Sequence, residues 1–150
     1  RTITLSYTFF EVGGKTPAQL KTVVAGAQNS GVIGDLGTTS VPVVTLNYTL
    51  AAPSAVNFQG VAELGGDGSD ADTEAYCSIY NDGDQISITF DVTFDDIGTD
   101  AVNPAVNVVL TSASTVAAGA HVAELRCRRD ANGTAVFKDD AAINIVAAPN

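Results

Sequence analysis

The chain has 150 residues, with 17 acidic side chains against 7 basic ones and a formal net charge of −10. It is 45% hydrophobic but only 16% charged, which is too apolar for a disordered chain, and its length fits one domain spanning residues 1–150. The acid excess and the small number of lysines argue against a nucleic-acid surface and against a basic membrane patch. No stretch approaches the roughly 20 apolar residues of a membrane-spanning helix.

The first segment alternates cleanly from Thr2 to Phe10, with Ile3, Leu5, Tyr7 and Phe9 on one face. Alternation with a period of two predicts a half-buried β-strand. This strand either closes its own sheet or is donated to a neighbouring copy of the chain, as in β-augmentation.

A short helix is predicted next. Thr16 can cap it, Pro17 suits the first helical position, and Gln19 completes a capping box. Its apolar stripe consists of Leu20, Val23 and Val24. Gly26 limits the helix to about two and a half turns, and residues 28–40 are predicted to form a loop.

From there the pattern predicts β-structure almost throughout. The expected strands are Val44–Leu50, Val56–Val61, Tyr76–Tyr80, Ile86–Phe94, Val106–Thr111, His121–Arg128, Thr134–Lys138 and Ala142–Ala147. Gly60 is interpreted as a possible bulge, Asn81–Asp84 and Asn132–Gly133 as turns, and Ser112–Gly119 as a loop of small residues. Strands with so few intervening helices predict an all-β, antiparallel two-sheet β-sandwich, of jelly-roll or immunoglobulin-like topology, with one short N-terminal helix.

Two cysteines, Cys77 and Cys127, fall on the apolar faces of predicted strands. This placement predicts one disulfide that ties two strands across the sandwich, and the alternative is a pair of buried free thiols in a reducing compartment. The chain opens on Arg1 rather than Met, which fits either removal of a secretory signal or a trimmed chain. Two isolated cysteines and one histidine lack the paired spacing of a zinc site.

The acidic segment within Gly65–Thr73 and the residue after it form the best metal candidate. Its carboxylates are Asp67, Asp70, Asp72 and Glu74. Closely spaced oxygens on a loop suit calcium, although the spacing departs from an EF-hand. A solvated charged loop explains the same residues, so no cofactor is predicted beyond a possible calcium.

No catalytic residue is predicted. His121 is the only imidazole, and on an alternating strand it is expected to be a packed or interface residue. Paired carboxylates for glycoside cleavage usually stand in a cleft lined by Trp and Tyr, and this chain has no Trp. A small hydrolase is therefore the least favoured class.

Three arginines surround Cys127, namely Arg126, Arg128 and Arg129. One interpretation pairs them with Asp130, Asp139 or Asp140 on an outward face. The other makes them a subunit contact against an acidic surface of a neighbouring copy.

The C-terminal segment from Val116 to Ala148 resembles the closing strands of jelly-roll modules in bacteriophage fibre and head proteins and in some secreted bacterial surface proteins. A small-residue turn there leads into a long strand, a glycine hairpin and a final strand. The matching positions are Gly119, His121, Leu125, Gly133, Ile143 and Val146. The resemblance implies a non-enzymatic module that works by assembly or by surface binding.

These observations favour a structural subunit of an extracellular or virion-surface assembly, a filament, fibre or shell, that associates with copies of itself through β-sheet edges. The outward faces of the predicted strands carry Thr and Ser rather than the Lys and Glu that normally prevent edge pairing. The alternative is a carbohydrate- or receptor-binding module, with or without a dependence on calcium, whose ligand contacts are Tyr76, Tyr80 and the acidic loop. Neither nucleic acid nor membrane is expected as a partner.

Overall fold

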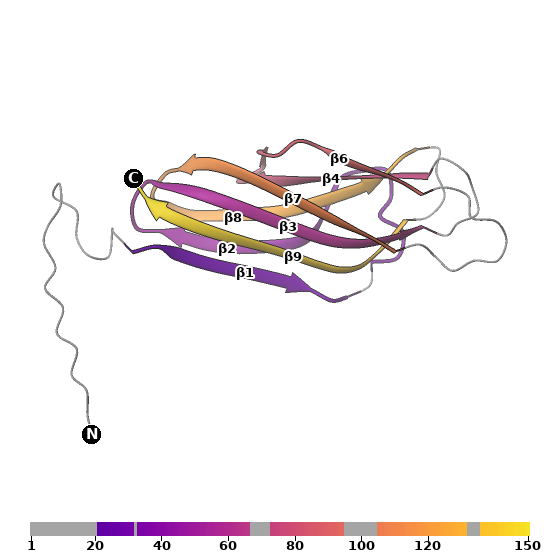
Figure 1. Cartoon of the computed structure of the whole chain (residues 1–150), viewed down its shortest axis with the longest axis horizontal. Helices are drawn as coiled ribbons and strands as arrows, with labels where there is room; N and C mark the ends of the chain where they lie inside the picture. The colour runs from indigo at the N-terminus through magenta and orange to yellow at the C-terminus, as the bar shows by residue number, and fades with distance from the viewer. Residues whose placement is uncertain (1–20, 32, 67–72, 95–104, 132–135) are drawn as a thin grey trace, which may run out of the picture.

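A computed structural model describes residues 21–31, 33–66, 73–94, 105–131 and 136–150. They form two packed antiparallel sheets (Figure 1). Sheet 1 has the strand order β1 (Val23–Asn29), β9 (Val136–Pro149), β3 (Ser54–Gly66) and β7 (Ala105–Val116). Sheet 2 has the order β2 (Val41–Leu50), β8 (Gly119–Arg129), β4 (Thr73–Asn81) and β5 (Asp84–Gln85), and β6 (Phe90–Phe94) also pairs with β4. The predicted all-β sandwich is confirmed.

The strands pair as nested hairpins. β4 pairs with β5 and β6, β3 with β7, β2 with β8 and β1 with β9, all antiparallel. One long two-stranded ribbon that is rolled up in this way is a jelly roll. Successive strands alternate between the two sheets, except that β4, β5 and β6 all lie in sheet 2. No helix long and apolar enough to cross a membrane occurs in the described ranges.

The core lies between the sheets and is filled mainly by alternate residues of the longer strands. In β8 the buried residues are Ala123, Leu125 and Cys127, and in β9 they include Ile143 and Ile145, as the alternation predicts. The aromatic pair in this core is Tyr48 and Phe58, whose rings meet edge to face with centroids 6.4 Å apart. Such edge contacts are the preferred geometry of aromatic rings.

The N-terminal helix is not found where the structure can test it. Val23, Val24 and Gly26 lie in β1, whose residues alternate between half-buried and exposed positions. β-branched and glycine residues are weak helix formers, and pairing with β9 satisfies their backbone groups instead. The rest of the predicted helix and the predicted strand Thr2–Phe10 lie outside the described residues.

The strand predicted from Ile86 to Phe94 is interrupted. On this side of β4 the pairing is made by two separate strands, β5 and β6. Between them the Ser87 hydroxyl accepts the Ile79 N–H at 2.8 Å, in the place of a backbone carbonyl. The interruption leaves Ile88 78% exposed and Phe90 38% exposed. A side chain that substitutes for the backbone ladder leaves no trace in the alternation of the sequence.

Three other strands are longer than predicted. β3 runs to Gly66, β9 is continuous through the predicted gap between its two halves, and β7 continues to Val116 through residues interpreted as a loop. β7 also lies at the edge of sheet 1, although an apolar run such as Val106–Thr111 is typical of a central strand. The small side chains of Ser112 to Val116 are compatible with a strand that has few neighbours.

Gly60 is not a bulge. It pairs regularly in β3, and the irregularity against β9 falls between Ala62 and Leu64. A Cβ at position 60 would lie 3.0 Å from Leu125 Cδ1 on the opposite sheet. The glycine therefore serves close packing between the sheets.

The turn at Asn81–Asp84 is confirmed. Asp82 and Gly83 both have positive φ, 52° and 91°, as the central residues of a type I′ hairpin require. The other predicted turn, Asn132–Gly133, lies outside the described residues.

Candidate functional site

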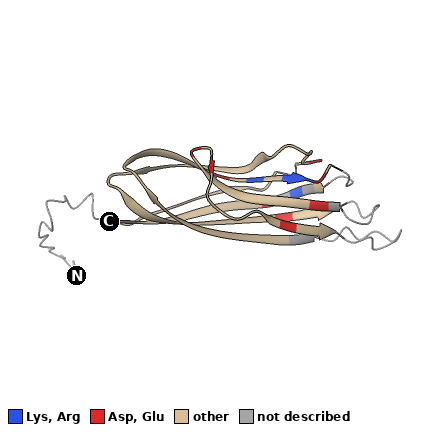
Figure 2. Ribbon diagram, turned by 90° about the horizontal axis from the view of Figure 1, so that it is seen from above, with Lys and Arg blue, Asp and Glu red and all other residues tan. Residues whose placement is uncertain are grey.

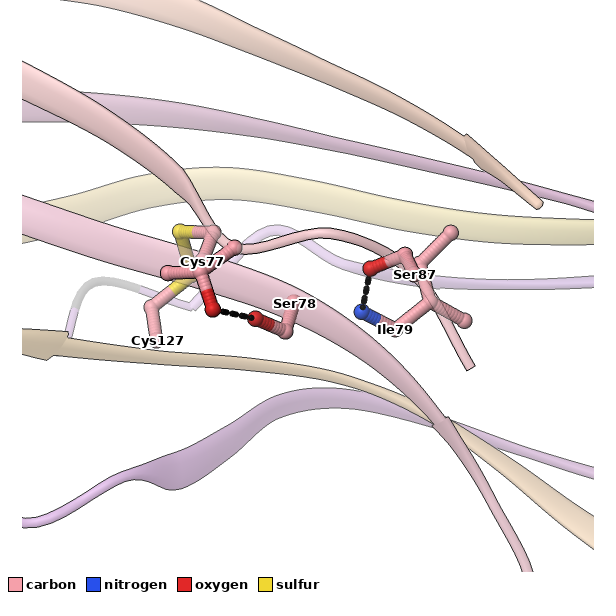
Figure 3. Close-up of a disulfide and its surroundings, with 6 residues drawn as sticks. Cys77, Ser78, Ile79, Ser87 and Cys127 are labelled. Atoms are coloured by element: carbon pink, nitrogen blue, oxygen red, sulfur yellow. Dashed lines mark hydrogen bonds between the residues drawn. A yellow bond between two sulfur atoms is a disulfide. The ribbon is translucent and has the colours of Figure 1, made fainter. Parts of the chain in front are cut away.

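The disulfide prediction is confirmed in its pairing and wrong in its placement. Cys77 of β4 and Cys127 of β8 form a disulfide and lie directly opposite each other in register (Figure 3). Both face the core, being 1% and 0% exposed, but they join neighbouring strands of sheet 2 rather than the two sheets. Their Cα atoms are 4.2 Å apart, close to the spacing of a non-hydrogen-bonded antiparallel pair.

Most of the candidate calcium ligands lie outside the described residues, namely Asp67, Asp70 and Asp72. Glu74 is described, and its carboxylate accepts a hydrogen bond from the Tyr76 hydroxyl. The described ranges contain no group of three or more residues able to hold a metal ion. Calcium binding thus stays a prediction.

Arg126 and Arg128 both stack on tyrosines across the β4–β8 pair. The Arg126 guanidinium lies 5.2 Å from the centroid of Tyr80, and that of Arg128 lies 4.2 Å from the centroid of Tyr76. Arg126 also has Glu124 at 3.6 Å. Each tyrosine therefore presents one ring face to a guanidinium, and that face is not available for stacking on a sugar.

Arg129 forms an ion pair with Asp35, at 2.9 Å from Nε to Oδ1, which differs from the three predicted partners. A hydrogen bond from the Gly37 N–H and a further one from Arg129 hold the pKa of Asp35 below its usual value. The arginines thus make contacts within their own chain, and their role as a subunit contact stays a prediction.

His121 is a packed residue that links three parts of sheet 2. Its Nδ1 lies 2.7 Å from Oδ2 of Asp82, and its Nε2 lies 3.0 Å from the carbonyl oxygen of Ala117. The ring lies tilted on Tyr48 at 5.4 Å between centroids, and the Tyr48 hydroxyl donates to Asn81 Oδ1 at 2.7 Å. These contacts secure the β4–β5 turn against β8 and β2.

Asp82 is held at both carboxylate oxygens, because Oδ1 also accepts the Val122 N–H at 2.8 Å. Partial burial acts to raise the pKa of Asp82, but the hydrogen bonds from His121 and from Val122 outweigh it and lower that pKa. Burial, together with the nearby charge of Asp82, raises the pKa of Tyr48 to about 12.

The two sheets differ in how their edges are protected. β2 carries Pro42 and an irregular register beside it, and on the opposite edge β5 and β6 are short, separated and contain Asp84 and Asp91. Proline, irregularity, short strands and charge are the usual means of preventing edge-to-edge pairing. Sheet 2 therefore has blunted edges on both sides.

Sheet 1 has none of these features at its edges. β7 is a 12-residue strand without any charged residue or proline, and in the described part of the chain its backbone pairs with β3 alone. The Ser112 hydroxyl of β7 also donates a hydrogen bond to the carbonyl oxygen of Ile86. β1, at the opposite edge, is also free of charge and proline over its 7 residues. Long uncharged edges of this kind offer rows of N–H and C=O groups to another strand.

The strands of sheet 1 are also poor in charge, and Figure 2 shows long stretches of strand without red or blue segments. One shallow hollow of about 540 Å³ is lined by Asn57, Gln59, Thr111, Asn144 and Val146 among others. A second hollow, of about 570 Å³, lies nearer the acidic residues Glu63 and Asp140. The face combines amides, hydroxyls and small apolar side chains.

Sequence reasoning missed Lys138, which is fully buried at the inner side of β9. Its ammonium group donates to the carbonyl oxygens of Asn29 at 2.6 Å and Gly31 at 2.5 Å. The signal was present, because Lys138 shares the parity of buried Val136. The prediction of a strand over Thr134–Lys138 assigned none of its residues to the inner face.

Comparisons with known proteins support the fold. No protein-family model and no curated protein matches the sequence. Dimeric latent PorU from Porphyromonas gingivalis is similar with a TM-score of 0.53 and 13% identity, over 93% of this chain and 14% of that one. The likeness therefore spans only a small part of the length of PorU.

Two further solved structures are similar at lower TM-scores. The C-terminal domain of EclA, a sugar-binding protein, gives a TM-score of 0.46 and 11% identity over 81% of this chain and 78% of that one. The VP2 subviral particle of infectious bursal disease virus gives 0.46 and 13% over 86% of this chain and 33% of that one. At 13% identity, the likeness to PorU shows the fold alone.

Proposed function

We propose that the chain is a non-enzymatic structural subunit that associates with copies of itself through the edges of sheet 1. The observation that carries this proposal is β7, a long edge strand without charge or proline. A strand of this kind is a template for pairing with another chain.

The contrast between the sheets strengthens the proposal. The same chain blunts both edges of sheet 2 and leaves β1 and β7 unblunted in sheet 1. A protein that worked alone would gain by protecting all four edges, because an unprotected edge invites aggregation. Self-association would explain why β1 and β7 are left without such protection.

The proposed location is extracellular or on a virion surface. The Cys77–Cys127 disulfide supports it, because structural disulfides persist in oxidising compartments.

The test is the mass of the purified full-length chain by size-exclusion chromatography with light scattering, together with negative-stain microscopy. Assembly through the sheet edges predicts a mass that grows with protein concentration and survives high salt, since the edge strands carry no charges that salt would screen. A monomer at every concentration would remove the proposal.

A second candidate function is glycan binding on the outer face of sheet 1. The hollow beside Asn57, Gln59 and Asn144 favours it, since side-chain amides can both donate to and accept from sugar hydroxyls. It predicts that the melting temperature of the wild type rises with a bound glycan, and that Gln59→Ala removes the rise while Thr49→Ala on sheet 2 leaves it. No shift across a broad glycan panel would exclude this function.

A further inference from the structure

The two unblunted edges of sheet 1 run in opposite directions. β1 is antiparallel to β9, β9 to β3, and β3 to β7. Three reversals make β1 and β7 antiparallel to each other, at opposite sides of the sheet (Figure 1). A second copy placed beside the first by translation alone would therefore set its β1 antiparallel to the first copy's β7.

The backbone groups of β9 define which residues point outward at these edges. The Asn150 N–H donates to Pro53 O at 3.0 Å, so Asn150 is directed toward the β3 side. Successive residues of a strand direct their backbone groups to alternate sides, so the N–H and C=O of Val146 are also directed toward β3. Val24 of β1 lies opposite Val146, and its own N–H and C=O are therefore directed away from β9, to the open side of β1.

The same alternation carries through to β7. Val146 is paired with Asn57 of β3, so the N–H and C=O of Asn57 are directed toward β9. On its other side Asn57 lies opposite Ala113 of β7. Ala113 therefore directs its N–H and C=O outward, and so does Thr111 two residues away. Both edges offer unpaired backbone groups, in the part of the chain that the structure describes, at residues that lie in the same cross-strand rows.

We propose that β7 of one copy pairs with β1 of the next copy and extends sheet 1 continuously from one copy to another. This inference rests on the proposed function and names the surfaces that perform it. In the register that continues the existing rows, Ala113 faces Val24 of the next copy and Thr111 faces Gly26 of the next copy.

The side chains at this junction are compatible. Val24 is 73% exposed and Val109 is 53% exposed, and both lie on the outer face, where the pairing partly covers them. On the inner face of the extended sheet, residues of β7 lie opposite Ala25 and Ala27 of the next copy. Both alanines are half-buried, so small side chains stay on the inner face. No charged residue takes part, so no like charges oppose each other.

The contact is heterologous, because each copy uses two different edges. Such contacts generate open-ended chains unless the rotation between copies closes a ring. The right-handed twist of sheets rotates each strand by roughly 20–25° relative to its neighbour, so the chain of copies is expected to be a twisted filament.

The experiment blocks each edge separately in the full chain. Thr111→Pro and Val24→Pro each remove an outward N–H without removing a donor from the ladder inside the copy. Each variant alone is expected to be a monomer. An equimolar mixture is expected to form dimers and nothing larger, because the intact β7 of one variant can still pair with the intact β1 of the other.

Thr49→Pro is the matched control, since Thr49 is an exposed residue of β2, an edge strand of sheet 2, and this variant should polymerise like the wild type. Thermal melting by circular dichroism shows whether each variant is folded. If a proline variant fails to fold, a Val24→Cys/Ala113→Cys variant replaces it, and a ladder of disulfide-linked copies under oxidation is the expected result. Absence of a ladder from assembled protein would overturn the pairing.

Other outcomes separate the alternatives. Dimers of Val24→Pro alone would indicate that β7 pairs with another β7, and would overturn the pairing. Deletion of Arg1–Phe10 should leave the filaments intact, and their loss would favour donation of that segment instead. In both cases the proposed function stands, whereas a wild type that never associates would remove it.

Discussion

Asp82 secures the β4–β5 turn against β8 through both oxygens of its carboxylate. The residue is also the non-glycine residue with positive φ among those described, at 52°. Asp and Asn tolerate this conformation better than other non-glycine residues because their side chains can hydrogen-bond locally. Backbone geometry and tertiary contact therefore favour the same residue.

Replacing Asp82 by Ala should lower the free energy of unfolding by about 2 kcal/mol, the sum of a strained left-handed conformation and lost hydrogen bonds. Asp82→Gly should cost less, since glycine removes the strain and loses only the hydrogen bonds. Urea denaturation of both variants measures the difference. Equal losses would show that the backbone conformation contributes nothing.

The lowered pKa values of Asp35 and Asp82 predict a loss of stability in acid. A carboxyl whose pKa is depressed by folding stabilises the protein above its usual pKa of 3.8, and this contribution disappears as the pH falls through the lower folded value. Thermal melting between neutral and strongly acidic pH measures it. The Asp35→Asn/Asp82→Asn variant should show a shallower acid dependence than the wild type, and an unchanged slope would contradict the assignment.

At this scale the sequence predicts local features well. The turn at Asn81–Asp84 follows from residues that tolerate positive φ, whereas the contact of Asp82 with His121 does not, since it joins residues 39 positions apart. Lys138 was missed for a related reason, because its partners Asn29 and Gly31 come from a distant segment.

The β4–β8 pair is the element that the disulfide reinforces. The bridge closes a loop with a sequence separation of 50 residues. In the chain-entropy model such a loop restricts the unfolded state and stabilises the fold by about 4 kcal/mol.

The Cys77→Ala/Cys127→Ala variant should therefore lose about 4 kcal/mol relative to the oxidised wild type. In excess reductant the wild type should melt close to the variant. Chemical denaturation under both conditions makes the comparison, and a variant as stable as the oxidised wild type would show that the bridge has no role in stability.

Alternation predicted β2, β4 and β8 because each of these strands buries one face. It failed for β1, whose half-buried and exposed residues resemble a short helical stripe until the pairing with β9 is known. It also failed at β7, since nothing in an apolar run shows whether a strand is central or at an edge. The candidate site consists of the two edge strands of sheet 1. It could not be predicted, because the sequence does not show which strands lie at the edges.

At the scale of the whole molecule, the nested pairing places an even number of strands in sheet 1 and so makes its two edges antiparallel. An odd number would give parallel edges, and copies related by translation would then meet in parallel pairs. Assembly by antiparallel pairing is thus a consequence of strand number and order, while the sequences of β1 and β7 leave the edges free of charge and proline.

The most direct measurement is sedimentation velocity of the wild-type chain and of Thr111→Pro over a wide range of concentrations. The account predicts that the wild type forms a series of species that grows without a fixed upper size, while Thr111→Pro remains a monomer with the same melting temperature. A wild type that stays monomeric, or that stops at a closed dimer, would contradict it.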